Sequence, residues 1–240
     1  MNTANMVQQS GFQFKQFYIE HGNVAMKVGT DGILLGSWVG SEKSKRILDI
    51  GTGSGLLAIM LAQQATNDCE IIGIDIDAAA VAQAIENAKQ CPWPHKLGFQ
   101  QAPLQQFIAD EFDLIVSNPP YFASGQHFDS ARQYARHDGQ LTINDLFEHS
   151  ARLLSANGQF ACILPTDIAT KAVDIAATFG LYCQQRLTVM TTLAKPAKRT
   201  LLLFSSTECS IIEQQLVIHQ RSGEYSEDYI ALCRDYYLHF

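Results

Sequence analysis

The chain has 240 residues, of which 47% are hydrophobic and 17% charged, and its formal net charge is −7 at pH 7. Soluble proteins average about 25% charged residues, so this composition excludes a disordered chain and suits a sheet covered by helices on both faces. The pI near 5.4 is unusual for a nucleic-acid binder. A nucleic acid would therefore have to meet a local basic patch.

The sequence shows no sign of export or of a membrane span. The N-terminus lacks a cationic signal region, and the longest apolar stretches, such as residues 56–62, are far too short to cross a bilayer. The six cysteines are scattered without a Cys-x-x-Cys pair, so we expect reduced thiols and no metal site. No repeat or linker is visible. We therefore predict one cytoplasmic domain over residues 1–240, with no membrane partner.

From residue 46 onward, short β-branched runs alternate with helical patterns, which is typical of a parallel α/β sheet with crossover helices. The expected elements of the first half are strands 46–50, 70–75, 97–101 and 112–118, a helix ending near residue 64, and a helix 77–90 with Asp77 as its N-cap.

The second half begins with a polar stretch, 122–140, and then changes character near its end. The expected elements are a helix 142–154 capped by Thr142, a turn at Asn157-Gly158, a strand 159–164, a helix 167–179, strands 181–191 and 199–206, an edge strand 215–219, and a helix from Ser226 to about residue 238. The connection between strands 181–191 and 199–206 is too short for a crossover helix, so this pair must be antiparallel.

A glycine-rich loop, Asp49-Ile-Gly-Thr-Gly-Ser-Gly55, joins the first strand to its helix. Gly51, Gly53 and Gly55 let the chain turn sharply and leave bare backbone beside a ligand, and Asp75 ends the next strand, where it can accept hydrogen bonds from ribose hydroxyls. A dinucleotide site typically has the spacing Gly-x-Gly-x-x-Gly, which this loop lacks. The carboxylate of Asp49 would repel a pyrophosphate but would suit an ammonium group. The loop therefore predicts S-adenosylmethionine; the alternative is a tight turn with locally capping aspartates.

Asn118, Pro119, Pro120 and Tyr121 follow the fourth strand, which should end beside the first strand and its glycine loop. Two prolines make the loop stiff, so the Asn118 side-chain oxygen and the Pro119 carbonyl can both accept hydrogen bonds from one NH₂ group. Such acceptors favour a pyramidal amide or adenine nitrogen whose lone pair can attack a methyl group, and Tyr121 can stack on a planar substrate. The alternative is a rigid proline turn with a core tyrosine.

These motifs resemble those of the N6-adenine and N5-glutamine methyltransferase group. Segments 12–17, 26–38, 225–229 and 236–238 are similar to the bacterial tRNA(Val) adenosine-37 N6-methyltransferase family, so the resemblance covers essentially the whole chain. The resemblance implies a Rossmann-like class I fold: a seven-stranded, mostly parallel sheet with an antiparallel C-terminal hairpin. It divides the chain into an extension at 1–45, a core at 46–206 and a final strand and helix at 207–240.

The resemblance implies catalysis by the four residues from Asn118 to Tyr121 and methylation of adenosine 37 in a valine tRNA. It implies that Lys27, Thr30 and Asp31 help to close the cofactor site; alternatively, Thr30 or Asp31 only caps a helix over a packed Leu34/Leu35 face. Relatives usually carry an acidic residue after the third strand, whereas this chain has Gln101-Ala-Pro103. Contacts to the cofactor adenine must then come from the backbone or from Ala102 or Leu104.

An RNA substrate also needs cations, each of which is equally interpretable as a solvated surface charge. The candidates are Arg132, Arg136, Lys195, Lys198 and Arg199, with Lys15 and Lys27. Aromatic residues within 122–140 can stack on bases or pack as a lid.

The main alternative function is methylation of a protein glutamine amide, as in release-factor methyltransferases. Those enzymes carry a helical N-terminal domain, whereas only about 45 residues precede the first strand here. A NAD-dependent oxidoreductase is disfavoured by the glycine spacing, and a binding module by the intact tetrapeptide.

Overall fold

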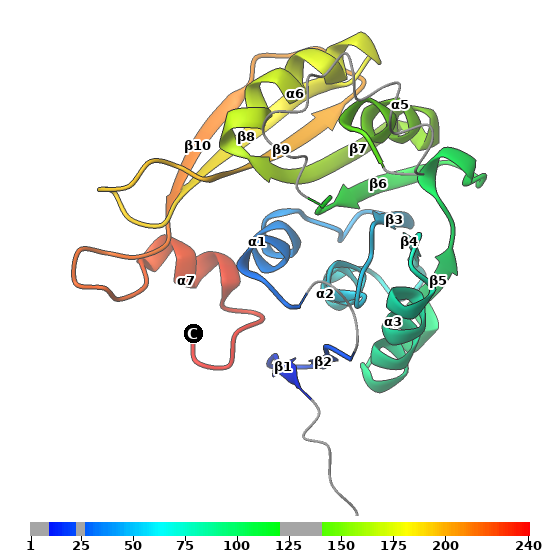
Figure 1. The fold of residues 1–240 in the computed structure, drawn as a ribbon, viewed down its shortest axis with the longest axis horizontal. Coiled ribbons are helices and arrows are strands. Elements are labelled where there is room, and N and C mark those ends of the chain that lie inside the picture. The colour runs from blue at the N-terminus through cyan, green and yellow to red at the C-terminus, as the bar shows by residue number, and fades with distance from the viewer. Residues whose placement is uncertain (1–9, 23–26, 121–140) are drawn as a thin grey trace, which may run out of the picture.

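The computed structural model describes residues 10–22, 27–120 and 141–240. Within them lies one eight-stranded sheet, in the order β10-β8-β9-β7-β6-β3-β4-β5, and a small two-stranded sheet, β1-β2. Adjacent strands are parallel except where β9 pairs with β7 and β8. The predicted Rossmann-like sheet with an antiparallel hairpin is confirmed (Figure 1).

The strands are β1 (Gly11–Gln13), β2 (Tyr18–Glu20), β3 (Arg46–Ile50), β4 (Glu70–Asp75), β5 (Leu97–Gln101), β6 (Phe112–Ser117), β7 (Leu154–Pro165), β8 (Tyr182–Met190), β9 (Arg199–Ser205) and β10 (Ile212–Val217). The α-helices are α1 (Thr30–Trp38), α2 (Leu56–Gln64), α3 (Ala78–Gln90), α5 (Ile143–Leu153), α6 (Thr166–Thr178) and α7 (Glu227–Cys233). None of the helices in the described ranges is long and apolar enough to span a membrane.

The apolar core has two layers, one on each face of the sheet. Alternation along a strand sends neighbours to opposite faces. Ile47 of β3 belongs to the core cluster that includes residues of α1, α2 and α7, while Leu48 belongs to the cluster that includes residues of α5 and α6. The helices cover both faces, and the carboxyl ends of β3, β4 and β6 remain at one edge of the sheet (Figure 1).

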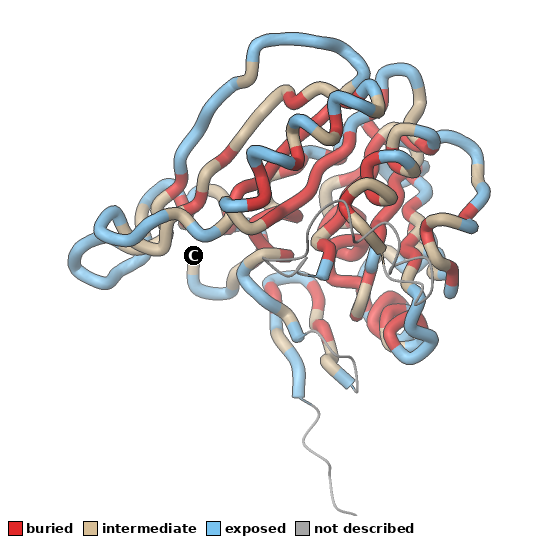
Figure 2. The backbone as a smooth tube through the Cα atoms, turned by 45° about the horizontal axis from the view of Figure 1, so that its top comes forward, coloured by how far each residue is buried: buried red, intermediate tan, exposed pale blue. Residues whose placement is uncertain are grey.

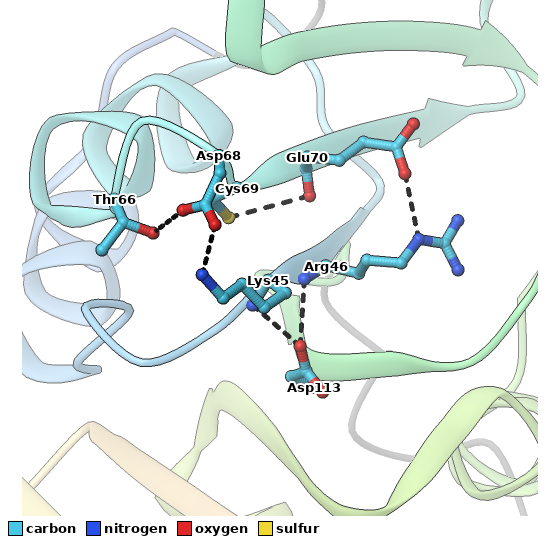
Figure 3. Close-up of polar contacts among 7 residues, drawn as sticks. All are labelled: Lys45, Arg46, Thr66, Asp68, Cys69, Glu70 and Asp113. Atoms are coloured by element: carbon cyan, nitrogen blue, oxygen red, sulfur yellow. Dashed lines mark hydrogen bonds and ion pairs between the residues drawn. The ribbon is translucent and has the colours of Figure 1, made fainter.

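The opposite, amino edge is held by a polar network (Figure 3). The Asp113 carboxylate on β6 accepts hydrogen bonds from the backbone N–H groups of Lys45 and Arg46, at 2.8 and 3.1 Å, and so ties β6 to β3. The side chains of these two cations pair with Asp68, which precedes β4, and with Glu70, its first residue. The side chains of Lys45 and Arg46 are thus engaged by neighbouring carboxylates.

Most predicted elements are confirmed, and the exceptions have physical causes. The strand β7 starts at Leu154, which pairs with Phe112 of β6, rather than at the predicted Gln159. Regular pairing resumes at Gln159 opposite Leu114, so residues 155–158, which include Asn157-Gly158, form an irregularity within β7 rather than a turn before it. The edge strand lies at residues 212–217, three residues before the predicted start, and adds an eighth strand to the sheet. The last helix ends at Cys233 rather than near residue 238.

Candidate active site

A hollow of about 250 Å³ opens at the carboxyl edge of β3 and β6. Three segments line it: the glycine loop from Gly51 to Ser54 with the start of α2, residues 27–32 at the start of α1, and Asn118 after β6. The predicted Lys27, Thr30 and Asp31 are thus brought to the same hollow as the glycine loop and Asn118. The predicted cofactor residues Asp49, Gly55, Asp75 and Ala102 are not part of this lining.

Left-handed backbone shapes the glycine loop. Gly51, Gly53 and Gly55 have φ values of 72°, 55° and 83°, which strongly favour glycine. A Cβ at Gly51 or Gly53 would meet nothing within 4 Å, whereas one at Gly55 would lie 3.2 Å from the Ala84 Cβ. The first two glycines therefore present bare backbone to open space, as a ligand site requires, and the third allows α2 to pack closely on α3.

The carboxylate of Asp75 supports the loop from the end of β4. One oxygen accepts a hydrogen bond from the Gly53 N–H at 2.9 Å, and the other accepts from the Asp77 N–H at 3.0 Å. Asp75 remains partly exposed, and each carboxylate oxygen has a second lone pair. The residue can therefore hold the loop and still accept hydrogen bonds from ribose hydroxyls. Asp77 caps α3 as predicted, accepting from the Ala79 N–H.

Asp49 is fully buried behind the glycine loop. Its Oδ2 accepts hydrogen bonds from the Thr52 hydroxyl at 2.7 Å and the Ala58 N–H at 3.2 Å, while Oδ1 has no partner among the described residues. Burial raises the pKa of this carboxyl to about 7, opposed by those two hydrogen bonds and assisted by the charge of Asp75. An unpaired buried carboxylate oxygen is chemically suited to a cationic ligand group, such as the ammonium of S-adenosylmethionine.

Asn118 lies where the strand order predicted it. Ser117 pairs with Ile50 in the sheet, and its hydroxyl donates to the Ile50 carbonyl at 2.9 Å, so the ends of β6 and β3 are fixed side by side. Asn118 follows directly and faces the start of α1, where a Cβ added to Gly32 would lie 3.9 Å from the Asn118 Nδ2. Pro119 is buried and Pro120 exposed, while Tyr121 lies outside the described residues.

The wall formed by α1 is joined to the far half of the sheet by an ion pair. Arg199, at the start of β9, places its Nε 2.7 Å from the Asp31 carboxylate, and both side chains are largely shielded from solvent. Helix α1 begins after Gly29, so neither Thr30 nor Asp31 is its N-cap, although Leu34 and Leu35 are packed as expected. This pairing favours Arg199 as a support for the hollow over Arg199 as a phosphate ligand.

Breaking this ion pair should weaken cofactor binding. Asp31→Asn and Arg199→Gln should each raise the cofactor dissociation constant by roughly three- to tenfold, the range for a shielded pair of modest strength. The exchanged variant with Asp31→Arg and Arg199→Asp should recover part of the loss, measured by calorimetry. If Arg199→Gln instead binds the cofactor normally but flattens the salt dependence of RNA binding, Arg199 is a phosphate ligand.

A buried asparagine that the sequence did not single out fixes two walls of the hollow. Asn87 of α3 donates from Nδ2 to the carbonyls of Ser54 and Glu20, at 2.8 and 3.1 Å, and accepts from the Glu20 N–H at 3.0 Å. The next residue, His21, accepts from the Val28 N–H at 3.2 Å. Asn87 thereby ties the N-terminal extension to the glycine loop, through contacts 33 to 67 positions apart that no local pattern reveals.

The region after β5 offers apolar surface next to Asp75. Ala102 is buried and its N–H donates to the Asp75 carbonyl at 3.0 Å, and Leu104 is buried as well. Ile76, which directly follows Asp75, is 59% exposed, and its carbonyl accepts from the Gln101 side chain. An exposed isoleucine beside the carboxylate that we expect to bind the ribose suits a flat adenine ring, so Ile76 is a better candidate for that contact than Ala102 or Leu104.

The remaining predicted residues do not line the hollow. Lys195 and Lys198 are exposed on the loop between β8 and β9, and Lys15 donates to the backbone carbonyls of Arg234 and Phe240. Arg132, Arg136 and the aromatic residues of 122–140 lie outside the described residues. Among the residues that the structure describes, no group of three or more His, Cys, Asp or Glu side chains gathers to hold a metal ion.

Solved structures with a similar fold include methyltransferases. A predicted O-methyltransferase from Agrobacterium tumefaciens has a TM-score of 0.69 at 16% identity, covering 86% of this chain and 96% of its own. A ribosomal protein L11 methylase from Lactobacillus delbrueckii subsp. bulgaricus has a TM-score of 0.53 at 20% identity, covering 72% and 76%. At these identities the likeness concerns the fold alone.

Sequence comparisons identify the family of this chain. The methyltransferase small domain family matches residues 27–188. A protein named tRNA1(Val) (adenine(37)-N6)-methyltransferase from Aeromonas salmonicida is 45% identical to this chain, and the match covers 97% of this chain and 99% of the relative. A protein of the same name from Bacteroides thetaiotaomicron is 42% identical, and the match covers 95% of this chain and 97% of the relative. The chain therefore belongs to the methyltransferase small domain family and to the family of the tRNA1(Val) (adenine(37)-N6)-methyltransferases.

Proposed function

We propose that this protein transfers a methyl group from S-adenosylmethionine to N6 of an adenine in tRNA, with adenosine 37 of a valine tRNA as the target, and that it does so in the cytoplasm. The observation that carries the proposal is the position of Asn118 beside the glycine loop in one hollow. The names of relatives that match nearly the whole chain support the choice of acceptor.

The cofactor would be held by the residues around that hollow. The open space beside the backbone of Gly51 and Gly53 would accommodate the cofactor, Asp75 would accept hydrogen bonds from its ribose, and the unpaired oxygen of Asp49 would bind its ammonium group. When bound, S-adenosylmethionine supplies an electrophilic methyl group on a sulfonium. Lys27, Thr30 and Asp31 close the same hollow from the side of α1.

Asn118 and Pro119 would act on the acceptor nitrogen. The lone pair of an adenine amino group is delocalised into the ring, so the group is a poor nucleophile. Two fixed acceptors, the Asn118 Oδ1 and the Pro119 carbonyl, hold both N–H bonds and favour a pyramidal nitrogen with its lone pair free. Asn118 and Pro119 would thus hold the nitrogen with its lone pair toward the methyl group that S-adenosylmethionine would supply, and the proton displaced from the nitrogen would pass to solvent water. No strong base is required.

The alternative acceptor, a protein glutamine amide, presents the same NH₂ group and is tested in parallel. Purified protein and labelled cofactor should methylate unfractionated tRNA from a strain that lacks the enzyme, and nucleoside analysis should find the label in N6-methyladenosine. Purified release factor should stay unlabelled. Label in the release factor and none in tRNA would reverse the assignment.

A further inference from the structure

The carboxyl edge of the sheet continues past the hollow to the antiparallel half. The ends of β6, β7, β8 and β10 and the start of β9 all lie at this edge, because β9 alone runs in the opposite direction. Two loops therefore project on the same side as Asn118: residues 191–198 between β8 and β9, and residues 218–226 after β10. The end of β10 is four strand spacings from that of β6, or roughly 19 Å at about 4.8 Å each.

These two loops form one unit. The Ile218 N–H donates to the Met190 carbonyl and the His219 N–H to the Thr191 carbonyl, both at 2.9 Å. The 218–226 turn is closed by a bridge between His219 and Tyr225 and by the Gln220 N–H bonded to the Glu224 carbonyl. Both loops lie side by side (Figure 1) and are largely exposed (Figure 2). We refer to residues 191–198 and 218–226 together as the edge ridge.

Charge on the edge ridge is mainly positive, unlike that of the chain as a whole. It carries Lys195, Lys198 and Arg221 against one acid, Glu224, and α7 then begins with Glu227 and Asp228 at its N-terminus. None of the three cations forms an ion pair within the described residues. In the antiparallel half of the sheet, the connections at the amino edge are residues 179–181 and 206–211, and they contain no lysine or arginine. At the amino edge, Lys45 and Arg46 are already paired (Figure 3).

A stacked aromatic pair accompanies these cations. The rings of His219 and Tyr225 lie 4.7 Å apart at 25°, and Tyr225 remains 43% exposed. Tyr225 also packs on Tyr229 and Phe240, with ring centroids 5.2 and 5.0 Å away, so its ring is held rigidly. An exposed ring that is held by packing and lies beside cations is a feature with which proteins bind unpaired nucleotides: phosphates contact the cations and a base stacks on the ring.

Building on the proposed function, we propose that the edge ridge binds the tRNA substrate beside its target adenine, with Lys195, Lys198 and Arg221 on phosphates and the His219–Tyr225 pair stacking on an unpaired base. The 19 Å reach matches a few nucleotides of an anticodon loop whose adenine lies at Asn118. Residues 218–226, which the sequence did not associate with RNA, become part of the substrate site.

The cations are tested by the salt dependence of tRNA binding. Lys195→Ala, Lys198→Ala and Arg221→Ala should each reduce the slope of log K against log salt concentration by about one, and the triple variant by nearly three. Lys43→Ala, an exposed cation at the amino edge, is the matched control and should leave the slope unchanged. Equal slopes for the triple variant and the wild type would overturn the phosphate contacts.

The aromatic pair is tested with Tyr225→Leu and Tyr225→Phe. Loss of the ring should weaken tRNA binding on the order of tenfold at every salt concentration, whereas phenylalanine keeps the stack and should bind like the wild type. Measurements of cofactor affinity and melting temperature would identify a folding defect in these variants. The variant His219→Ala, which keeps Tyr225 packed on Tyr229 and Phe240, should still weaken tRNA binding severalfold. Unchanged tRNA affinity in both Tyr225→Leu and His219→Ala would overturn the stacking site.

Methyl transfer by the wild type separates the two proposals. If the wild type methylates tRNA while the edge-ridge variants bind tRNA and react like the wild type, the edge ridge does not bind tRNA and the proposed function stands. If the wild type neither binds nor methylates tRNA, both the proposed function and the proposed role of the edge ridge are wrong.

Discussion

Replacing Asn118 by alanine should reduce methyl transfer by about 10²–10³-fold, the range known for loss of one preorganised polar contact at a reacting group. The residue follows a strand end that the Ser117–Ile50 hydrogen bond holds in place, so its amide is fixed before substrate arrives. Its side chain lines the hollow and is only half-buried, so little core packing is lost. Single-turnover rates with saturating tRNA and cofactor measure the effect on the chemical step.

Cofactor and tRNA dissociation constants of Asn118→Ala should stay close to those of the wild type, which distinguishes a role in the reaction from a role in binding. Ser117→Ala is a matched neighbour: it loosens the strand end without removing the acceptor and should have a smaller effect. Near-normal turnover in Asn118→Ala would contradict the mechanism.

Cofactor affinity should rise as pH increases through about 7, because Asp49 must be ionised to attract an ammonium group. Burial raises the pKa of Asp49 to about 7 from an ordinary value of 3.8, so the free protein carries this carboxyl half-protonated near neutrality. A bound cation favours the carboxylate, and binding at pH 7 should release a fraction of a proton. Calorimetry in buffers of different ionisation enthalpy measures that release.

Asp49→Asn should abolish both the pH dependence and the proton release, and should weaken cofactor binding roughly 10- to 100-fold, the order expected for a lost charged hydrogen bond. The folded pKa is raised, so the stability contributed by Asp49 is fully present below about pH 4 and is lost as pH rises through about 7. The cofactor-free variant should therefore melt at a higher temperature than the wild type at pH 8. Cofactor binding that is independent of pH in the wild type would remove Asp49 from the ammonium site.

Local patterns were sufficient for much of the fold and for the centre of the site. The strands β3, β4 and β5 have the predicted bounds, and Asp77, Thr142 and Ser226 cap helices as expected, because a short polar side chain before a helical pattern acts within a few residues. The order of parallel strands then places Asn118 beside the glycine loop.

Other features depend on partners far along the chain or on pairing that no pattern encodes. The pairing of Arg199 with Asp31 spans 168 positions, and the hydrogen bonds of Asn87 join three separate segments. The strand β10 is mostly exposed and contains Glu213, Gln214 and Gln215, so its hydrophobic pattern is weak and its predicted start lay three residues too late. These long-range contacts hold the walls of the hollow together, and no local sequence pattern reveals them.

In the proposed reaction, Asn118 and its neighbours position one adenine in the anticodon loop of a valine tRNA for methylation. The most direct measurement is mass spectrometry of nuclease fragments from an unmodified valine tRNA transcript after reaction with purified protein and labelled cofactor. A transcript with guanosine at position 37 is the control. One labelled methyl group on the fragment containing adenosine 37, and none on the control, is the predicted result. Label at other adenines, or equal label in the control, would contradict it.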